Sequence, residues 1–167
     1  MDKEKDTCVN SELFSSDTRE FLYLLWRHNV RYVVVGGRAV IFYGHARMTG
    51  DIDVFYDRDA DNAQALFDAL KVFWKGDIPG IDRPQELEED ELILQFGRPP
   101  NRLDLINNLS AVDFEEAWEG RVTAVMKEQN REIPVHFIGI EELRHNKRSI
   151  ARPKDRDDLQ YLVDRFD

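Results

Sequence analysis

The sequence contains little cysteine and no long hydrophobic run. Cys8 is the only cysteine among 167 residues, which excludes an intrachain disulfide framework and a cluster of thiolate metal ligands. No apolar stretch approaches the length needed to cross a bilayer, and the first residues, MDKEKDTCVNSE, are too polar for a signal peptide. We therefore expect a cytoplasmic protein with no membrane partner.

The composition is that of one folded domain. The chain is 42% hydrophobic and long enough to bury one sizeable core, but too short for two independent cores. It contains no repeats, low-complexity tracts or dividing linker. We predict a single domain over residues 1–167, with a flexible leader at 1–14, a core at 31–108 that contains the candidate catalytic residues, and a helical C-terminal segment at 139–167.

Hydrophobic periodicity predicts an α+β fold, in which a small mixed sheet is flanked by helices. A first amphipathic helix follows the cap candidate Ser15, and a second helix covers residues 63–74. Residues 122–126 and 133–139 have the pattern of a hairpin whose strands are joined by a longish loop, KEQNRE. A last helix opens at Pro153. The remaining predicted elements are strands at 32–35, 51–55, 91–96 and 103–106 and a loop at 75–90.

Residues 32–55, YVVVGGRAVIFYGHARMTGDIDVF, begin with the pattern of a phosphate-binding turn. The Val-rich start predicts a buried strand, and Gly36 and Gly37 let the backbone turn tightly and approach a ligand closely. A helix then begins, and its first amide groups have no partner within the helix, which suits phosphate oxygens.

The same segment ends in a pair of aspartates. Alternate residues of a strand point to one face, so Asp51 and Asp53 project together while Ile52 packs on the other side. Asp104 lies in the apolar run LDLI, where a buried carboxylate is costly without a metal or a partner. Its side chain could therefore join Asp51 and Asp53 at one metal site. Such oxygen ligands, together with substrate phosphates, suit Mg²⁺. Each feature alone is also typical of a loop or a solvated strand edge, but their order and spacing together predict a nucleotide site.

The glycine pair, the Asp51-Ile52-Asp53 motif and the later strand residue Asp104 resemble the nucleotidyltransferase superfamily related to the catalytic core of DNA polymerase beta, in particular its minimal bacterial members. Arg47, Thr49 and the tail at 139–162 are similar to the abortive-infection (AbiE-type toxin) branch of that superfamily. Many members have Ser at the second glycine position, so a hydroxyl that could contact phosphate is absent here.

The resemblance implies transfer of a nucleoside monophosphate from a nucleoside triphosphate to a hydroxyl, with release of pyrophosphate. Asp51, Asp53 and Asp104 are then both the catalytic residues and the ligands of two Mg²⁺ ions, with Mn²⁺ as an alternative ion. The acceptor stays open between a small molecule, a transfer RNA and a protein side chain. The expected nucleotide-binding residues are Gly36, Gly37, Arg38, Arg47, Thr49 and Lys147.

Several of these residues have a structural alternative. The net charge of −10 repels nucleic acid overall, but residues 144–156 are rich in Lys and Arg. Lys147 either folds back onto the triphosphate or acceptor, or belongs to a solvated helix end. Arg47 and Thr49 either contact phosphates or cap a loop. His45 lies in the same segment, whereas the other histidines lack the spacing of a metal site or a catalytic triad.

Two other classes of function remain open from the sequence. The chain could be a toxin or antitoxin component with a cognate partner, modifying a transfer RNA or a partner protein, as the branch resemblance suggests. It could also be a non-catalytic nucleotide-binding module, although the intact set of three aspartates argues against that.

Overall fold

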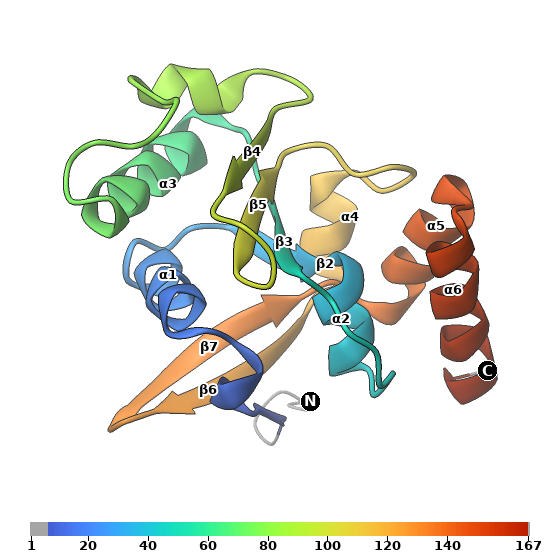
Figure 1. Ribbon diagram of the computed structural model, residues 1–167. Helices are drawn as coiled ribbons and strands as arrows, with labels where there is room; N and C mark the ends of the chain where they lie inside the picture. Colours follow the sequence, from blue (N-terminus) through green and yellow to red (C-terminus); the bar gives the residue numbers. More distant parts are fainter. Residues whose placement is uncertain (1–6, 167) are drawn as a thin grey trace.

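The computed structural model describes residues 7–166 and has an α+β fold (Figure 1). Seven strands form one mixed sheet in the order β1-β6-β7-β2-β3-β5-β4. The strands are β1 (Cys8–Val9), β2 (Tyr32–Val35), β3 (Asp51–Tyr56), β4 (Ile93–Phe96), β5 (Arg102–Ile106), β6 (Val122–Glu128) and β7 (Arg131–Phe137). The helices are α1 (Ser16–Arg27), α2 (Gly36–Phe42), α3 (Ala60–Phe73), α4 (Phe114–Glu119), α5 (Ile140–Ile150) and α6 (Pro153–Phe166), with short 3₁₀ helices η1 (Ser11–Leu13) and η2 (Pro84–Glu88). The predicted mixed sheet flanked by helices is confirmed.

The centre of the sheet is buried on both faces. β2 runs antiparallel to β3, which runs parallel to β5. Val34 and Val54 belong to one hydrophobic core, whereas Val33 and Phe55 belong to the core on the opposite face. All four residues of β2 are buried, which explains why the strand is a continuous apolar run rather than an alternating one.

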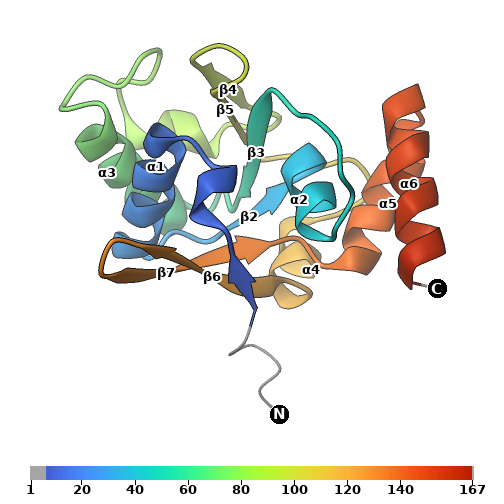
Figure 2. The ribbon, with the colours of Figure 1, turned by 60° about the horizontal axis from the view of Figure 1, so that its bottom comes forward.

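The helices are divided between the two faces of the sheet (Figures 1 and 2). Apolar side chains of α1, α3 and η2 pack into the core on one face. Those of α2, α4, α5 and α6 pack into the core on the other. Covering both faces leaves the ends of the central strands as the places where polar groups can gather.

The helix boundaries follow the signals in the sequence. The Ser15 side chain accepts a hydrogen bond from the Thr18 amide and caps α1, as expected. The helix predicted at 63–74 corresponds to α3. The C-terminal segment predicted at 139–167 contains α5 and α6, and α6 begins at Pro153 as predicted.

The β6–β7 hairpin differs from the prediction, because its loop is short. β6 continues to Glu128 and β7 begins at Arg131, so only two residues join them. Gln129 adopts a positive φ of 54°, a conformation that Gly or Asn usually supplies in such turns. The position with positive φ therefore lacks the Gly or Asn that would mark a tight turn, and the predicted long loop is wrong.

The N-terminal segment also differs from the prediction. Cys8 of β1 pairs with Val125 of β6, and the Phe14 side chain is buried. The predicted flexible leader is therefore wrong for residues 7–14, while residues 1–6 lie outside the described part. The predicted loop at 75–90 contains η2, and β4 begins at Ile93 rather than at residue 91.

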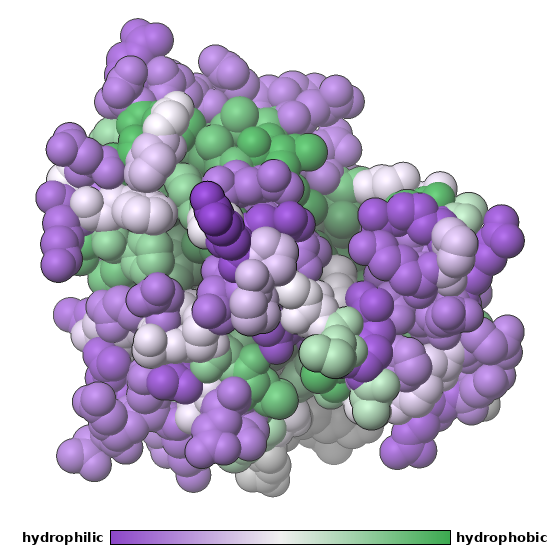
Figure 3. Space-filling view, viewed as in Figure 1, coloured by the Kyte–Doolittle hydropathy of each residue, from purple (hydrophilic) through white to green (hydrophobic). Residues whose placement is uncertain are grey.

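Most of the surface seen in Figure 3 is hydrophilic, and apolar side chains show mainly around α3 and β4. Val72 of α3 and Ile93 of β4 are among the exposed large hydrophobic residues. Within residues 7–166, none of the helices has the length and apolar character needed to cross a membrane.

Candidate active site

The fold brings the three predicted aspartates together at one end of two neighbouring strands. Asp51 and Asp53 are the first and third residues of β3, and β5 pairs with β3 in a register that sets Asp104 opposite Asp53. One carboxylate oxygen from each of the three lies within 4.8 Å of the others. The parallel β3–β5 pairing thus brings Asp104 beside two aspartates that lie far from it in sequence, and the three form a cluster of hard oxygen ligands.

Arg102 is the counter-charge of the cluster, and it was not among the predicted site residues. Its Nε donates to Asp104 Oδ1 at 2.9 Å, and its Nη2 contacts Asp104 Oδ2 at 3.0 Å and Asp51 Oδ2 at 2.8 Å. The signal was present, because Arg102 lies two residues before Asp104 on the same strand and therefore on the same face. Asp104 is buried, and this bidentate pair satisfies both of its oxygens.

Among the described residues no cation forms an ion pair with Asp53, and its electrostatic environment is unfavourable for a charge. Burial first, and then the negative charges of Asp51 and Asp104, together raise the pKa of Asp53 to about 7, with Arg102 opposing them. A divalent cation among these oxygens would relieve the like-charge repulsion. The donor set is therefore suited to Mg²⁺ or a similar hard ion.

The glycine pair lies directly against this cluster. Gly36 has a positive φ of 65°, and a Cβ there would collide with the Asp53 carboxylate, so the position requires glycine. A Cβ on Gly37 would lie 2.6 Å from Arg47 Nη2 and 3.0 Å from Thr49 Oγ1. The two side chains fill the space that a side chain at residue 37 would occupy, which gives a physical reason for the absence of Ser there.

Thr49 and Arg38 lie around the same carboxylates. The Thr49 hydroxyl donates to Asp51 Oδ1 at 3.0 Å and so orients that side chain. Arg38 donates to the Leu13 carbonyl at 2.6 Å. Burial lowers the pKa of the Arg38 guanidinium, and the negative charge of Asp51 partly opposes this. Both predicted residues therefore border the cluster, with Arg38 anchored to the N-terminal segment.

Lys147 is not available to fold back onto the triphosphate, as one of the two expectations had it. Only 3% of its side chain is exposed, and its Nζ lies 3.0 Å from both Asp155 Oδ1 and Asp158 Oδ2. Because two carboxylates of α6 take up its charge, Lys147 joins α5 to α6. The alternative of a solvated helix end is equally wrong, since the side chain is buried in an ion-pair network.

Arg47 and His45 connect this network to the site. Arg47 Nε lies 3.2 Å from Asp158 Oδ1, and His45 Nε2 lies 3.8 Å from the same oxygen. The His45 ring also stacks on Tyr161 of α6, with 4.4 Å between ring centroids. Of the two alternatives raised for Arg47, a simple loop cap does not describe it, because its Nε faces Asp158 and its Nη2 lies beside Gly37.

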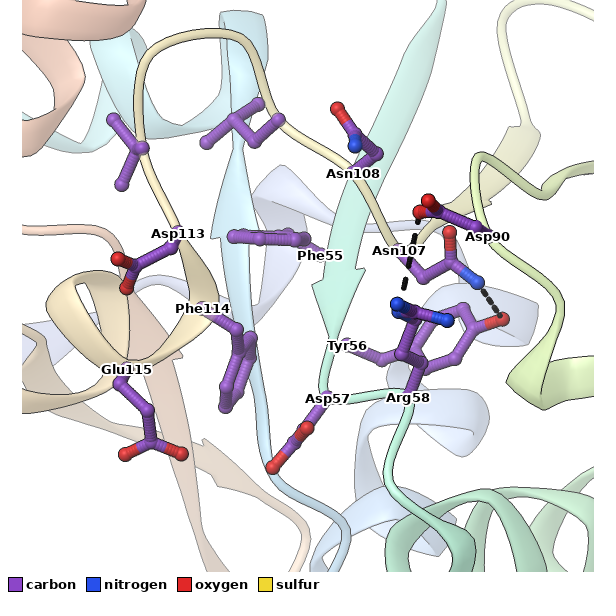
Figure 4. Close-up of a pocket in the computed structure, with 12 residues that line it drawn as sticks. Phe55, Tyr56, Asp57, Arg58, Asp90, Asn107, Asn108, Asp113, Phe114 and Glu115 are labelled. Atoms are coloured by element: carbon purple, nitrogen blue, oxygen red, sulfur yellow. Dashed lines mark hydrogen bonds and ion pairs between the residues drawn. The ribbon is translucent and has the colours of Figure 1, made fainter.

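A cavity of about 580 Å³ lies at the opposite end of β3 from the carboxylates (Figure 4). Several of its charged residues form ion pairs: Arg58 with Asp90 at 3.9 Å, and Asp57 and Glu115 each with Arg31 at 2.8 Å. Asn107 donates to the Tyr56 hydroxyl at its wall. The cavity contains none of the predicted site residues.

A mixed sheet with three clustered carboxylates on adjacent strands, next to a glycine turn, defines a domain of the nucleotidyltransferase type. Residues 13–166 match the family model described as "Nucleotidyltransferase of unknown function (DUF6036)", and the chain belongs to this family. The superfamily expected from the glycine pair and the aspartates is thereby confirmed. No curated protein shows a significant match to the chain.

Proposed function

We propose that the protein transfers a nucleoside monophosphate from a nucleoside triphosphate to a hydroxyl group in a reaction that depends on a divalent metal ion. The acceptor oxygen forms a bond to the α-phosphorus, the bond from that phosphorus to its bridging oxygen breaks, pyrophosphate leaves, and the hydroxyl proton is released. The observation that supports this proposal is the cluster of Asp51, Asp53 and Asp104, in a chain that belongs to a nucleotidyltransferase family.

Several residues of and around the cluster have a role in this proposal. Asp51, Asp53 and Asp104 hold the metal, and Mg²⁺, when bound, stabilises charge on the attacking and leaving oxygens of an in-line displacement. Gly36, which a side chain could not replace, lets the triphosphate approach the carboxylates. Thr49 keeps Asp51 oriented.

An anionic acceptor, such as a transfer RNA, is supported by the charges beside the site. Arg148, Lys154 and Arg156 are exposed where α5 meets α6, and none has an ion pair within the part of the chain that the structure describes. Asp53 is among the charges that raise the pKa of the Arg152 guanidinium, after its dominant hydrogen bond with Asp155. Arg152, at the same α5–α6 junction, is therefore near enough to the carboxylate cluster for the charge of Asp53 to act on it.

Calorimetry with the purified protein tests the proposal directly. We expect ATP to bind with Mg²⁺ and to lose at least about tenfold in affinity with excess chelator, because the uncompensated carboxylates repel the phosphates. Asp51→Asn should abolish the difference between the two conditions. Equal affinity with Mg²⁺ and with chelator in the wild type would refute metal-dependent binding.

The acceptor can be identified by transfer of a label. The protein is incubated with Mg²⁺, a cell extract and each of the four nucleoside triphosphates labelled on the α-phosphate, and the labelled product is separated into small molecules, RNA and protein. Retention of label in one fraction with the wild type, and its loss with Asp104→Asn, would name the acceptor class. An absence of transfer to every fraction would favour a non-catalytic nucleotide-binding module.

A further inference from the structure

Arg47 lies between the glycine turn and helix α6. Its Nη2 occupies the space beside Gly37, at 2.6 Å from where a Cβ of that residue would be. Its Nε lies 3.2 Å from Asp158 Oδ1. Guanidinium has five N–H donors in a fixed plane, so it can face one carboxylate while its terminal nitrogens point elsewhere. Figure 2 shows the segment between α2 and β3, which contains Arg47, passing beside α6.

Asp158 is the only partner that the described residues provide for the Nε side of Arg47. The Asp158 side chain is 1% exposed, and Lys147 approaches its other oxygen, Oδ2, at 3.0 Å. Lys147 therefore fixes the carboxylate from α5 and leaves Oδ1 facing Arg47, with His45 Nε2 farther away, at 3.8 Å. The contact between Arg47 Nε and Asp158 is an ion pair and not an aligned hydrogen bond. The negative charge of Asp158, rather than a directed hydrogen bond, therefore holds the guanidinium.

We propose that Asp158 is a positioning residue that aims Arg47 at the triphosphate bound over Gly36 and Gly37. The inference rests on the proposed function and adds a link from α6 to the phosphate site. Arg47 touches the nucleotide, and Asp158 acts through Arg47. A buried carboxylate on α6 thereby controls nucleotide affinity.

Asp155 provides a matched control on the same helix. It lies one turn before Asp158, is fully buried and also pairs with Lys147, at 3.0 Å. Its remaining partner is Arg152, at 2.6 Å, and not Arg47. Removing either negative charge disturbs the α5–α6 network, but only Asp158→Asn removes the charge that faces Arg47.

The test compares melting temperature and the dissociation constant of Mg²⁺-ATP in the full chain. We expect Asp158→Asn to raise that constant by about tenfold, the effect of one lost charge-assisted contact, and Asp155→Asn to change it by less than about threefold. Both variants should melt at a lower temperature. In the background of Arg47→Gln, Asp158→Asn should weaken binding by no more than about twofold, because its effect passes through Arg47.

Arg47→Lys keeps the proposal testable even where Asp158→Asn fails to fold. A compact ammonium cannot face Asp158 and the glycine turn at once, so we expect at least about fivefold weaker binding of Mg²⁺-ATP. Wild-type affinity in Arg47→Lys, equal losses in Asp155→Asn and Asp158→Asn, or additive effects of Arg47→Gln and Asp158→Asn would each overturn the positioning role. Absence of Mg²⁺-dependent ATP binding in the wild type would instead overturn the proposed function.

Discussion

Asp104 can be either a metal ligand or a structural partner of Arg102, and one substitution separates these roles. If Asp104 acts on the acceptor side of the metal site, Asp104→Asn should leave the dissociation constant of Mg²⁺-ATP within about threefold of the wild-type value. The rate of transfer should fall at least about a hundredfold, roughly 2.7 kcal/mol, because the lost interaction belongs to the transition state. Single-turnover transfer and calorimetry on one preparation measure both quantities.

A purely structural role of Asp104 would give a different result. Arg102 donates to both oxygens of Asp104, so a purely structural carboxylate would give a lower melting temperature in Asp104→Asn. Unchanged transfer by the folded protein, together with that lower melting temperature, would remove Asp104 from the catalytic set.

Asp53 should destabilise the metal-free protein at neutral and alkaline pH. Its folded-state pKa is raised from 3.8 to about 7, so the folded protein binds the proton more tightly than the unfolded chain does. Stability is therefore lost as pH rises through this interval. With chelator present, Asp53→Asn should melt about 4 °C or more above the wild type at pH 8, and this advantage should shrink at pH 5.

Asp51→Asn is the control for Asp53→Asn. Asp51 accepts the Thr49 hydroxyl and pairs with Arg102 at 2.8 Å, so its charge is compensated in the folded state. We expect no increase in the melting temperature of this variant. An equal increase in both variants would show that general crowding of carboxylates, and not the burial of Asp53, sets the stability.

At the scale of elements, β7 contains a histidine that should make the sheet sensitive to acid. His136 Nδ1 lies 2.8 Å from the Thr123 hydroxyl of β6, and its ring packs between Tyr32 and Trp118. Burial first, and then the positive charge of Arg121, together lower its pKa to about 4. The unfolded chain therefore takes up the proton first, and stability is lost as pH falls from 6.5 towards 4.

Chemical denaturation at pH 7.5 and pH 5 measures this loss. We expect His136→Gln to be less stable than the wild type at pH 7.5, because the ring contacts are gone. Between pH 7.5 and pH 5, the free energy of unfolding should fall by about 1–2 kcal/mol less in the variant than in the wild type. An identical decrease in both proteins would mean that His136 does not contribute to acid sensitivity.

The sequence predicts an element well where its own residues determine it. Ser15 and Pro153 mark the starts of α1 and α6 because a cap and a fixed φ are local properties. The alternation of Asp51 and Asp53 likewise follows from strand geometry. The two-residue strand β1 has no recognisable pattern, since pairing with β6 alone defines it.

Contacts between elements explain where the prediction of the site failed. The cations of residues 144–156 are visible in the sequence, but their partners depend on how α6 packs on α5. Asp155 and Asp158 are three residues apart on one helix face, which was the available signal that Lys147 had buried partners. The parallel pairing that sets Asp104 opposite Asp53 also had to come from the fold.

At the scale of the whole molecule, the uneven distribution of charge bears on the acceptor. The net charge is −10, yet exposed cations gather where α5 meets α6. A polyanionic acceptor would be repelled by most of the surface and attracted to this area, so association should weaken as salt screens the attraction. A small neutral acceptor would have no such dependence.

A triple variant tests this attraction. Replacing Arg148, Lys154 and Arg156 with Gln should lower transfer to an RNA acceptor by about tenfold at low salt, and should reduce the slope of log affinity against log salt by about 2. The control replaces Lys71, Lys75 and Arg83, near α3 on the other side of the sheet, which changes the net charge equally. If both triple variants respond alike, net charge and not the local cations governs association. If neither changes transfer, the acceptor does not bind through the α5–α6 junction, and the argument for an anionic acceptor fails while the metal site stands.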